Sequence, residues 1–479
     1  MRHKTFLSTL LIVSLVFIFA ILISSEMDRL PSASAATTQA EQTTNYLPLV
    51  IRPVIQSNHY GIEMREITQN AKLDEMVEAG AHFIRYNGVR WDLIEPIKGE
   101  LHWEILASLE EQLLNAANVN RPVILIVRGA PAWARQVPDS LCGPIKESEL
   151  PAFANFMSEL VKRYSIPPFN VKHWEIGNEP DAPIHNFDPV IFPFGCWGIY
   201  GDPYYGGRYY GEMLKYIYPQ VKQADPAAKV LFGGLLLVCD PINPPLDPYG
   251  QPKDCTPSKF LEGALLNGAG AYFDIVSFHA YDYYYAAYGQ YGNDNWHSAW
   301  NTTGPTVRAK TAYLRSVLSK YQLNKPLIVS EISVLCDLNC ETDFEATKAN
   351  FLAITYASTQ ADNLQATIWY DVVGDWRHSS LFIDWSIPTP AYYAYLTSEG
   401  SLGSLVFTQV IDEYAGVRGY EFSQGSGQRI WLLWSSDGAP HTIELPGLPS
   451  AIWNKIGTAL DPVSNLTINV DPIYIAWDN

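Results

Sequence analysis

Basic residues are scarce in this chain. Its 479 residues include 32 Lys and Arg against 50 Asp and Glu, which gives a formal net charge of -18 at pH 7. Nucleic-acid binders gather Lys and Arg on one surface, because phosphate contacts need cations. The composition therefore predicts no nucleic-acid partner. It also excludes whole-chain disorder, since 47% of the residues are hydrophobic and supply enough apolar surface for a packed core.

Several motifs that carry nucleotide or metal chemistry are also missing. The sequence has no Gly-x-Gly-x-x-Gly after its first strand-like segment and no Walker A motif, so the usual signals of a bound nucleotide are lacking. It has no Cys-x-x-Cys and no His-Glu-x-x-His spacing either. We therefore expect no metal ion and no organic cofactor.

Cysteines are few but even in number. Six cysteines fit three disulfides in an oxidising compartment, although sequence alone does not fix their connectivity. Loop length favours two pairings and leaves the third by default: Cys239–Cys255, Cys336–Cys340 and Cys142–Cys196.

Residues 1–35 have the pattern of a signal peptide or a membrane anchor. Two basic residues precede an apolar run from Phe6 to Ile23, and Ala33-Ser34-Ala35 then supplies the small residues that signal peptidase accepts. The run lies at the border between the lengths of the two segments, so both interpretations stay open. Either one predicts a protein that is secreted or held at the extracellular face of the cell envelope. Residues 36–48 are typical of a flexible linker.

Residues 49–398 alternate between short apolar runs and longer helix-like segments. The runs are apolar at consecutive positions, as in Val-Ile-Leu-Ile-Val at 123–127, which is typical of parallel strands buried on both faces. Eight strand-then-helix units predict an α/β fold, a (β/α)8 TIM barrel. A doubly wound open sheet is the main alternative, and it loses support because the nucleotide motifs are absent. The expected strands are Gln56–Glu63, His82–Tyr86, Pro122–Arg128, Lys172–Gly177, Lys229–Leu236, Phe273–His279, Pro326–Glu331 and Ala366–Asp371.

Residues 399–479 have a different sequence pattern. Strand-like runs follow one another quickly, with turn signals such as Gly425-Ser426-Gly427 between them. This pattern predicts a C-terminal antiparallel β-sandwich-like domain. Four tryptophans of this domain suit either its core, which is the commoner use, or a sugar-binding face. They are Trp431, Trp434, Trp453 and Trp477.

Two of the predicted barrel strands end in a glutamate. The fourth runs into Asn178-Glu179-Pro180, and the seventh ends at Glu331. The carboxyl ends of barrel strands share one rim, which is where active sites of this fold lie. Two opposed carboxylates suit glycoside hydrolysis, because one can protonate the leaving oxygen while the other acts at the anomeric carbon. A single glutamate at a strand end is more often an ion-pair partner, whereas this pair favours catalysis.

The segment at 174–181, Trp-Glu-Ile-Gly-Asn-Glu-Pro-Asp, resembles the acid/base motif of clan A retaining glycoside hydrolases. These enzymes are (β/α)8 barrels in which the acid/base ends strand four and the nucleophile ends strand seven. The segment Trp-Asp-Leu-Ile-Glu-Pro at 91–96 and the trailing β domain are closest in look to family 39. The resemblance extends over most of residues 49–397.

The resemblance implies a role for each residue that matches the motif. Glu179 would be the acid/base and Glu331 the nucleophile. Five further residues would bind the substrate or support the nucleophile: Asn178 at the sugar 2-hydroxyl, Arg85, His279 and Tyr281 near the nucleophile, and Trp369 as an aromatic floor under the sugar. Arg85, His279 and Trp369 also have structural readings, as an ion pair, a satisfied polar side chain and barrel packing. Glu175, lower in strand four, is interpreted as structural.

The expected function is that of an exported retaining O-glycoside hydrolase, which cleaves poly- or oligosaccharides by a two-carboxylate double displacement. Its partner would be the carbohydrate substrate. A transglycosylase using the same site and a catalytically silent carbohydrate-binding surface protein are the alternatives. Two positions depart from the relatives. Gly177 stands where family 39 enzymes often carry Trp, and this chain has Arg128-Gly129-Ala130-Pro131-Ala132-Trp133 where many clan members carry His after strand three.

Overall fold

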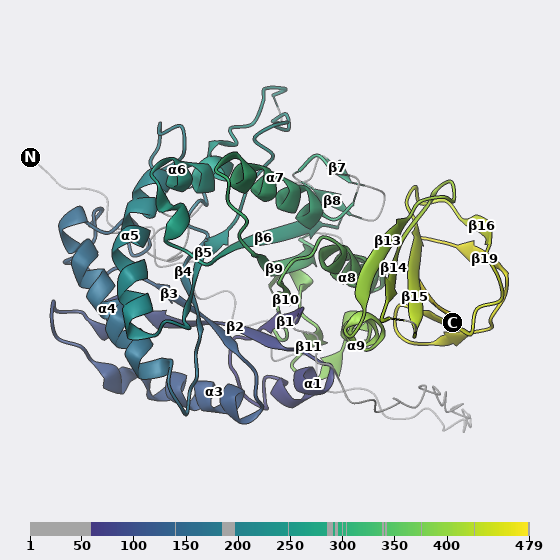
Figure 1. The fold of residues 1–479 in the computed structure, drawn as a ribbon, viewed down its shortest axis with the longest axis horizontal. Helices are drawn as coiled ribbons and strands as arrows, with labels where there is room; N and C mark the ends of the chain where they lie inside the picture. Colours follow the sequence, from purple (N-terminus) through teal and green to yellow (C-terminus); the bar gives the residue numbers. More distant parts are fainter. Residues whose placement is uncertain are drawn as a thin grey trace, which may run out of the picture. The chain divides into compact units, whose positions relative to one another are not determined.

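The computed structural model of the protein (Figure 1) describes residues 59–477, apart from 139, 184–196, 248, 285–290, 293–295, 299, 303, 338–339, 341–342, 375 and 426. The predicted signal or anchor segment and the linker lie outside the described residues. Among the helices that are described, none is long and apolar enough to cross a membrane.

Eight parallel strands close into a barrel (Figure 1). Each of the first five pairs with the next along the chain, β6 then pairs with β9, β9 with β10, and β10 with β1. All eight predicted strands are present, so the predicted TIM barrel is confirmed. The strands are β1 (Tyr60–Glu63), β2 (Phe83–Arg90), β3 (Val123–Arg128), β4 (His173–Asn178), β5 (Lys229–Leu235), β6 (Ile275–Tyr283), β9 (Leu327–Leu335) and β10 (Ala366–Trp369).

Helices between these strands form the outer layer (Figure 1). They are α1 (Leu73–Glu78), α2 (Trp91–Ile94), α3 (Ala107–Asn118), α4 (Leu150–Tyr164), α5 (Gly207–Ala224), α6 (Phe260–Leu266), α7 (Thr306–Lys320), α8 (Phe344–Ala361) and α9 (Pro390–Leu402). Two small antiparallel pairs are inserted, β7 (Tyr291–Gly292) with β8 (His297–Ser298) and β11 (Phe382–Ile383) with β12 (Ile387–Pro388). Single 3-10 turns occur at Trp103–Leu106, Glu147–Glu149, Thr256–Lys259, Ala269–Ala271 and Trp376–His378.

The inside of the barrel changes from apolar to polar along the strands. Near the amino ends, one cluster of buried apolar side chains fills it: Phe83, Ile124, Leu231, Ile275, Ile328, Ala366 and Ile368. Inward-facing residues recur at every second position of a strand, so Arg85 follows Phe83 and Ser277 follows Ile275 on the inner face. The polar layer therefore lies toward the carboxyl ends.

A register shift between β6 and β9 places two of the predicted site residues side by side. Phe278 pairs with Val329, but the next residue, His279, pairs with Glu331. The extra residue on β9 is a bulge, and bulges re-aim the side chains that follow them. His279 and Glu331 are thus lateral neighbours at the rim.

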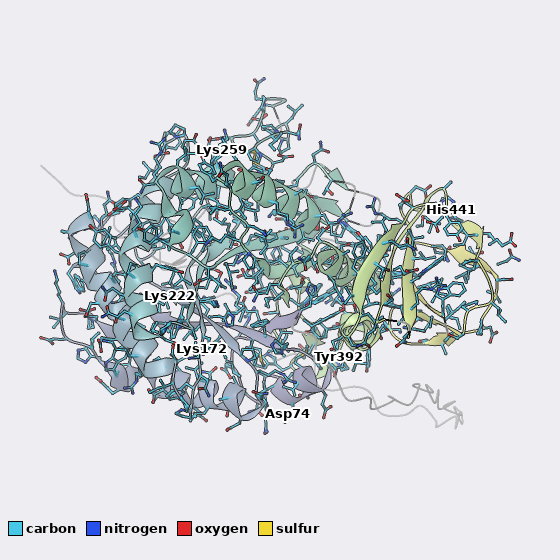
Figure 2. The ribbon with its side chains drawn as sticks, in the orientation of Figure 1. Asp74, Lys172, Lys222, Lys259, Tyr392 and His441 are labelled. Atoms are coloured by element: carbon cyan, nitrogen blue, oxygen red, sulfur yellow. A yellow bond between two sulfur atoms is a disulfide. The ribbon has the colours of Figure 1, made fainter. Side chains whose placement is uncertain are left out.

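Ion pairs stabilise the opposite, amino-terminal end of the strands. Lys172, just before β4, contacts Asp225 at 2.6 Å, and Lys222 on α5 contacts Asp274 at 2.9 Å. Figure 2 labels both lysines on the outside of the barrel. These pairs serve stability, because active sites of this fold lie at the other end of the strands.

The C-terminal region forms two antiparallel sheets, so the predicted β-sandwich-like domain is confirmed. On β15, Trp431 and Leu433 face a core shared with the smaller sheet, while Ile430 and Leu432 belong to the main core cluster that includes the barrel helices. The larger sheet has the order β13 (Val406–Ile411), β14 (Val417–Ser423), β15 (Arg429–Ser435), β20 (Ile473–Trp477), β17 (Ala451–Asn454) and β18 (Ala459–Leu460), and the smaller one joins β16 (His441–Glu444) to β19 (Asn465–Ile468).

The domain's tryptophans lie in its packed interior. Trp431, Trp434 and Trp477 are buried, and the half-buried Trp453 stacks on Tyr474 and donates its indole N–H to Ser401. The structure therefore favours the core reading of these residues over a sugar-binding face.

Two of the predicted disulfides are confirmed, Cys239–Cys255 and Cys336–Cys340. Cys142 is also disulfide-bonded, while its expected partner, Cys196, lies outside the described residues.

Candidate active site

Six of the seven predicted site residues meet at the carboxyl ends of the barrel strands. They are Arg85 on β2, Asn178 and Glu179 at the end of β4, His279 and Tyr281 on β6, and Glu331 on β9. The chain leaves β4 through left-handed backbone, with φ of 82° at Gly177 and 50° at Glu179. A Cβ at Gly177 would meet no atom within 4 Å, so the backbone conformation, rather than space, favours glycine here. This accounts for one departure from the family 39 pattern.

Arg85 is the buried centre of the polar layer. Its Nε donates to Glu175 at 2.7 Å, and its Nη1 donates to Glu331 at 2.5 Å and also to Glu63. Although burial opposes the charge, the surrounding carboxylates hold the pKa of Arg85 well above its ordinary value. One cation cannot balance three buried carboxylates, and burial holds the pKa of Glu63 well above its ordinary value. Arg85 thus gives Glu331 a permanent positive neighbour.

His279 joins the two catalytic candidates. Its Nδ1 lies 2.8 Å from Oε1 of Glu179 and 3.3 Å from Oε2 of Glu331. Its Nε2 lies 3.4 Å from Nη2 of Arg85, and a guanidinium can only donate, so Nδ1 is assigned the ring proton. Burial lowers the pKa of His279 to about 4, which makes the ring neutral at pH 7. It therefore hydrogen-bonds to Glu179, lies next to Glu331 and adds no charge.

Glu179 has the titration behaviour of a general acid. Burial raises its pKa from 4.5 to about 7, and the charges of Arg85 and Lys310 act in the opposite direction. Lys310 on α7 donates to the backbone oxygens of His279 at 2.8 Å and Leu236 at 2.7 Å. Lys310 therefore fixes the backbone position of His279. A carboxyl group with a pKa near 7 is partly protonated at neutral pH, as an acid catalyst must be.

Tyr281 and Asn178 complete the polar contacts. The Tyr281 hydroxyl donates to Oε2 of Glu331. The side-chain oxygen of Asn178 accepts from Nη2 of Arg85 at 2.6 Å, which fixes the amide and leaves its N–H groups as donors. The contact of Tyr281 with Glu331 is the one expected from the sequence, whereas the contact of Asn178 with a sugar stays a prediction.

Trp369 does not lie where it was expected, and this prediction is corrected. Its side chain is 0% exposed, packs against Phe351 and donates its indole N–H to the backbone oxygen of Ser379. A ring with no open face cannot support a sugar. The exposed indole at the rim belongs to Trp376, which is 38% exposed and contacts the ring of Tyr281 at 5.5 Å between centroids. Tyr370 lies between Trp369 and this indole in sequence, and its ring contacts both Tyr281 and Trp376.

Sequence reasoning missed three contributors to the site. Glu63 ends the first predicted strand, so the strand-end rule that selected Glu331 would have found it. Tyr370 was passed over for the adjacent Trp369. Trp376 lies in a segment with left-handed backbone at Arg377 and His378, which has no periodic pattern to read.

The distances among Glu179, His279 and Glu331 would also suit a bound metal ion. Ligand atoms of Glu179, His279 and Glu331 lie within 4.8 Å of one another. Against this reading, Arg85 is 2.5 Å from Glu331 and already supplies a positive charge. A second cation beside a guanidinium would be repelled.

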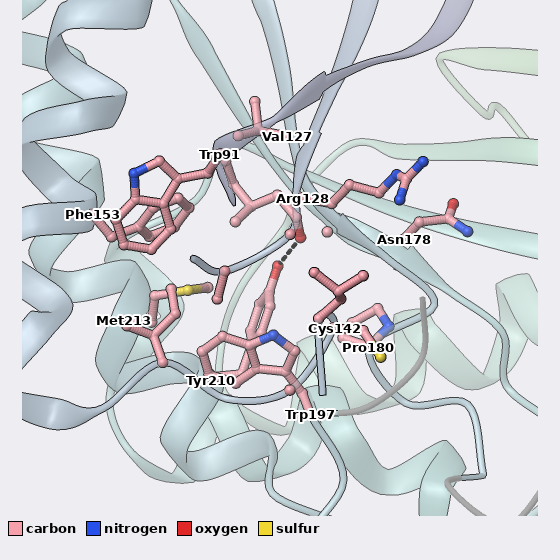
Figure 3. Close-up of a pocket in the computed structure, with 17 residues that line it drawn as sticks. Trp91, Val127, Arg128, Cys142, Phe153, Asn178, Pro180, Trp197, Tyr210 and Met213 are labelled. Atoms are coloured by element: carbon pink, nitrogen blue, oxygen red, sulfur yellow. Dashed lines mark hydrogen bonds between the residues drawn. The ribbon is translucent and has the colours of Figure 1, made fainter. Parts of the chain in front are cut away.

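A cavity adjoins the site between the ends of β3 and β4 (Figure 3). Its apolar part is lined by Trp91, Phe153 and Met213, and the Tyr210 hydroxyl closes one side by donating to the backbone of Ile176 at 2.6 Å. At its other end lie four residues from the two strand ends: Arg128, Gly177, Asn178 and Pro180.

Comparisons with known proteins agree with the fold. No protein-family model and no curated protein sequence matches the chain. Solved structures do match. A family 39 glycoside hydrolase from Bacteroides cellulosilyticus WH2 is 18% identical, with a TM-score of 0.66 over 88% of this chain and 81% of that one. A family 30 endoxylanase from Clostridium papyrosolvens C71 is 11% identical, with a TM-score of 0.57 over 88% and 97%.

A third similar structure is a conserved exported protein from Bacteroides fragilis, 11% identical, with a TM-score of 0.60 over 87% of this chain and 97% of that one. At these identities the likeness concerns the fold. The resemblance to clan A glycoside hydrolases, noted in the sequence, is therefore confirmed at the level of architecture.

Proposed function

We propose that the protein is an exported retaining O-glycoside hydrolase that cleaves poly- or oligosaccharides through Glu179 and Glu331. The observation that carries this proposal is the spacing of the two carboxyl groups across His279, with oxygens within 4.8 Å of each other. Retaining enzymes hold their carboxyl groups about 5–5.5 Å apart, whereas inverting enzymes need about 6.5–9.5 Å to admit a water molecule. The short spacing supports the retaining mechanism.

In the first step, Glu179 gives its proton to the glycosidic oxygen while Glu331 attacks the anomeric carbon. The bond to the leaving group breaks, and a glycosyl ester of Glu331 forms. Arg85 and Tyr281 both donate hydrogen bonds to Glu331 and hold its carboxylate for the attack.

In the second step, the ionised Glu179 removes a proton from water. The resulting nucleophile attacks the anomeric carbon and releases Glu331, so the product keeps its original configuration. Asn178, whose oxygen is held by Arg85, would donate from its amide to the sugar 2-hydroxyl. Tyr370 and Trp376 would take the aromatic role first assigned to Trp369.

Other observations support the same proposal. The similar solved structures include glycoside hydrolases of families 39 and 30. A silent sugar-binding barrel would need one carboxylate lost or displaced, and both are in place. A transglycosylase would use the same residues and differ only in its acceptor. Export is supported by the N-terminal sequence, by the disulfides and by the exported B. fragilis protein of similar fold.

The test is a panel of aryl glycosides and polysaccharides with the wild type, Glu179→Gln and Glu331→Gln. We expect hydrolysis by the wild type and a first-formed product of retained configuration by NMR. Azide should restore turnover of activated aryl glycosides by Glu179→Gln and yield a glycosyl azide of retained configuration, because the glycosyl ester of Glu331 is still formed. Unimpaired hydrolysis by Glu331→Gln, or an inverted product, would contradict the proposal.

A further inference from the structure

Arg128 is the last residue of β3 and faces the mouth of the barrel. Ile124 lies in the inner apolar cluster, and the two-residue alternation then turns Ile126 and Arg128 to the same inner face. In Figure 3, the side chains of Arg128 and Asn178 project in the same direction, away from the apolar part of the cavity. Arg128 therefore lies one strand away from the residue expected at the sugar 2-hydroxyl.

No described carboxylate forms an ion pair with Arg128, and Asp92, the acid that acts on its charge, is itself held by Arg90. Its Nε donates to the amide oxygen of Asn87 at 2.6 Å, and Nη1 is buried without any partner in the described part of the chain. The other arginines of this rim are paired. Arg85 contacts three carboxylates, and Arg90 holds both oxygens of Asp92 at 2.6 Å.

The cation persists at neutral pH. Burial lowers the pKa of Arg128 to about 10; Arg90 lowers it further and Asp92 acts in the opposite direction, and this value still leaves the guanidinium protonated. Leaving a buried donor without a partner is costly, and the cost is greater for a charged group. In a chain of net charge -18, carboxylates are plentiful, yet none of the described ones lies in contact with Arg128. These contacts are those expected of a cation whose anionic partner is supplied by a bound ligand.

We propose that Arg128 binds an anionic substituent of the glycan, a uronic acid carboxylate or a sulfate ester, in the sugar subsite beside Asn178. The two nitrogens that remain after Nε is engaged form part of the planar fork with which arginine grips two oxygens of one anion. The inference rests on the proposed glycoside hydrolase function and adds a substrate class to it.

The experiment compares matched anionic and neutral glycans. The carboxylate arm uses glucuronoxylan and oligogalacturonides with their carboxyl-reduced forms, and the sulfate arm uses chondroitin 4-sulfate with its desulfated form. The enzymes are the wild type, Arg128→Gln, Arg128→Lys and the control Arg163→Gln. Arg163 lies on α4 and pairs with Glu110 at 2.7 Å, away from the rim.

We expect the wild type to favour the anionic member of one pair. Arg128→Gln should lower kcat/KM for that member by about 10- to 100-fold and for its neutral counterpart by less than about 3-fold, as loss of one charged hydrogen bond predicts. Arg128→Lys should keep part of the preference, and Arg163→Gln all of it. Equal losses on both members, or no loss on either, would overturn the inference while leaving the hydrolase proposal standing.

A binding measurement separates the two proposals. Calorimetry with the same oligosaccharides on Glu331→Gln, with and without Arg128→Gln, does not depend on turnover. Anion-selective binding that needs Arg128, in a protein that hydrolyses none of the glycans, would support the inference and contradict the hydrolase proposal. If neither anionic nor neutral glycans bind, the inference is overturned.

Discussion

The Nδ1 atom of His279 lies 2.8 Å from Oε1 of Glu179, and the imidazole carries no charge at neutral pH. A charged imidazole there would lower the pKa of Glu179, whereas the neutral ring leaves burial as the dominant influence. The pKa of Glu179 is consequently raised to about 7. Burial therefore keeps part of Glu179 protonated at neutral pH, and the neutral histidine adds no charge that would oppose this.

This pKa sets the alkaline side of the pH profile. The protonated form of Glu179 is needed in the first step, so kcat/KM should fall about tenfold per pH unit above pH 7. Initial rates of a glycoside with a poor leaving group, measured from pH 5 to 9, test this. In Glu179→Gln, the residual rate on an activated aryl glycoside should lack this decline. A wild-type profile flat to pH 9 would show that Glu179 is not the acid.

The same pKa predicts a stability effect. Glu179 binds its proton more tightly in the folded state, so its contribution is complete below pH 4.5 and is lost as the pH rises through about 7. Glu179→Gln has no such loss. The free energy of unfolding of Glu179→Gln minus that of the wild type should therefore increase as the pH rises from 4.5 to above 7. The total increase should be on the order of 3 kcal/mol. Urea titrations at pH 4.5, 6 and 8 measure this difference, and a constant difference across the series would contradict it.

Tyr281 supports the nucleophile through its hydroxyl group. Tyr281→Phe removes the hydrogen bond to Glu331 and keeps the ring that contacts Trp376. We expect kcat to fall by about 10- to 100-fold with little change in KM, because the lost contact acts on Glu331 more than on the bound sugar. Tyr356→Phe is the matched control, since its hydroxyl contacts the backbone of Gly61. Equal effects of the two substitutions would mean that the Tyr281 hydroxyl is merely structural.

The cluster of Glu179, His279 and Glu331 also makes a prediction about metal removal. Because the buried Arg85 guanidinium would repel a metal ion bound at Glu331, dialysis against EDTA should leave both kcat/KM and the melting temperature unchanged. Readdition of Zn²⁺ should give no stimulation. Activity lost with EDTA and restored by a divalent cation would reassign these residues as ligands.

The sequence predicted the parts of the site that follow from strand position. Glu179 and Glu331 stand where apolar runs stop, and parallel strands bring such ends to one rim whatever the loops do. The prediction for Trp369 was wrong because the position of a residue on a strand does not show which aromatic ring remains exposed. Its indole turns into the core, while Trp376, seven residues on in an aperiodic turn, is the exposed one. The bulge that aligns Glu331 with His279 also has no pattern in the sequence, since it arises from pairing between distant strands.

The Arg85 network gives the largest predicted effect on stability. Arg85→Met would leave Glu175 and Glu331 buried beside each other without their cation, and should lower the free energy of unfolding by about 3–5 kcal/mol. Arg85→Lys should recover little of this, because one ammonium group cannot span the partners that the guanidinium fork reaches. Arg163→Met, which breaks an exposed pair with Glu110, should cost less than about 1 kcal/mol.

A double-mutant cycle shows whether the charges themselves are responsible. Glu175→Gln removes one buried carboxylate, so adding it to Arg85→Met should relieve part of the damage. The two substitutions together should cost less than their sum by more than about 1 kcal/mol, measured by urea unfolding at pH 7. Simple additivity would instead mean that Arg85 stabilises the barrel by packing alone. In that case Arg85 would not act on Glu331 through its charge, and the proposed mechanism would lose its electrostatic basis.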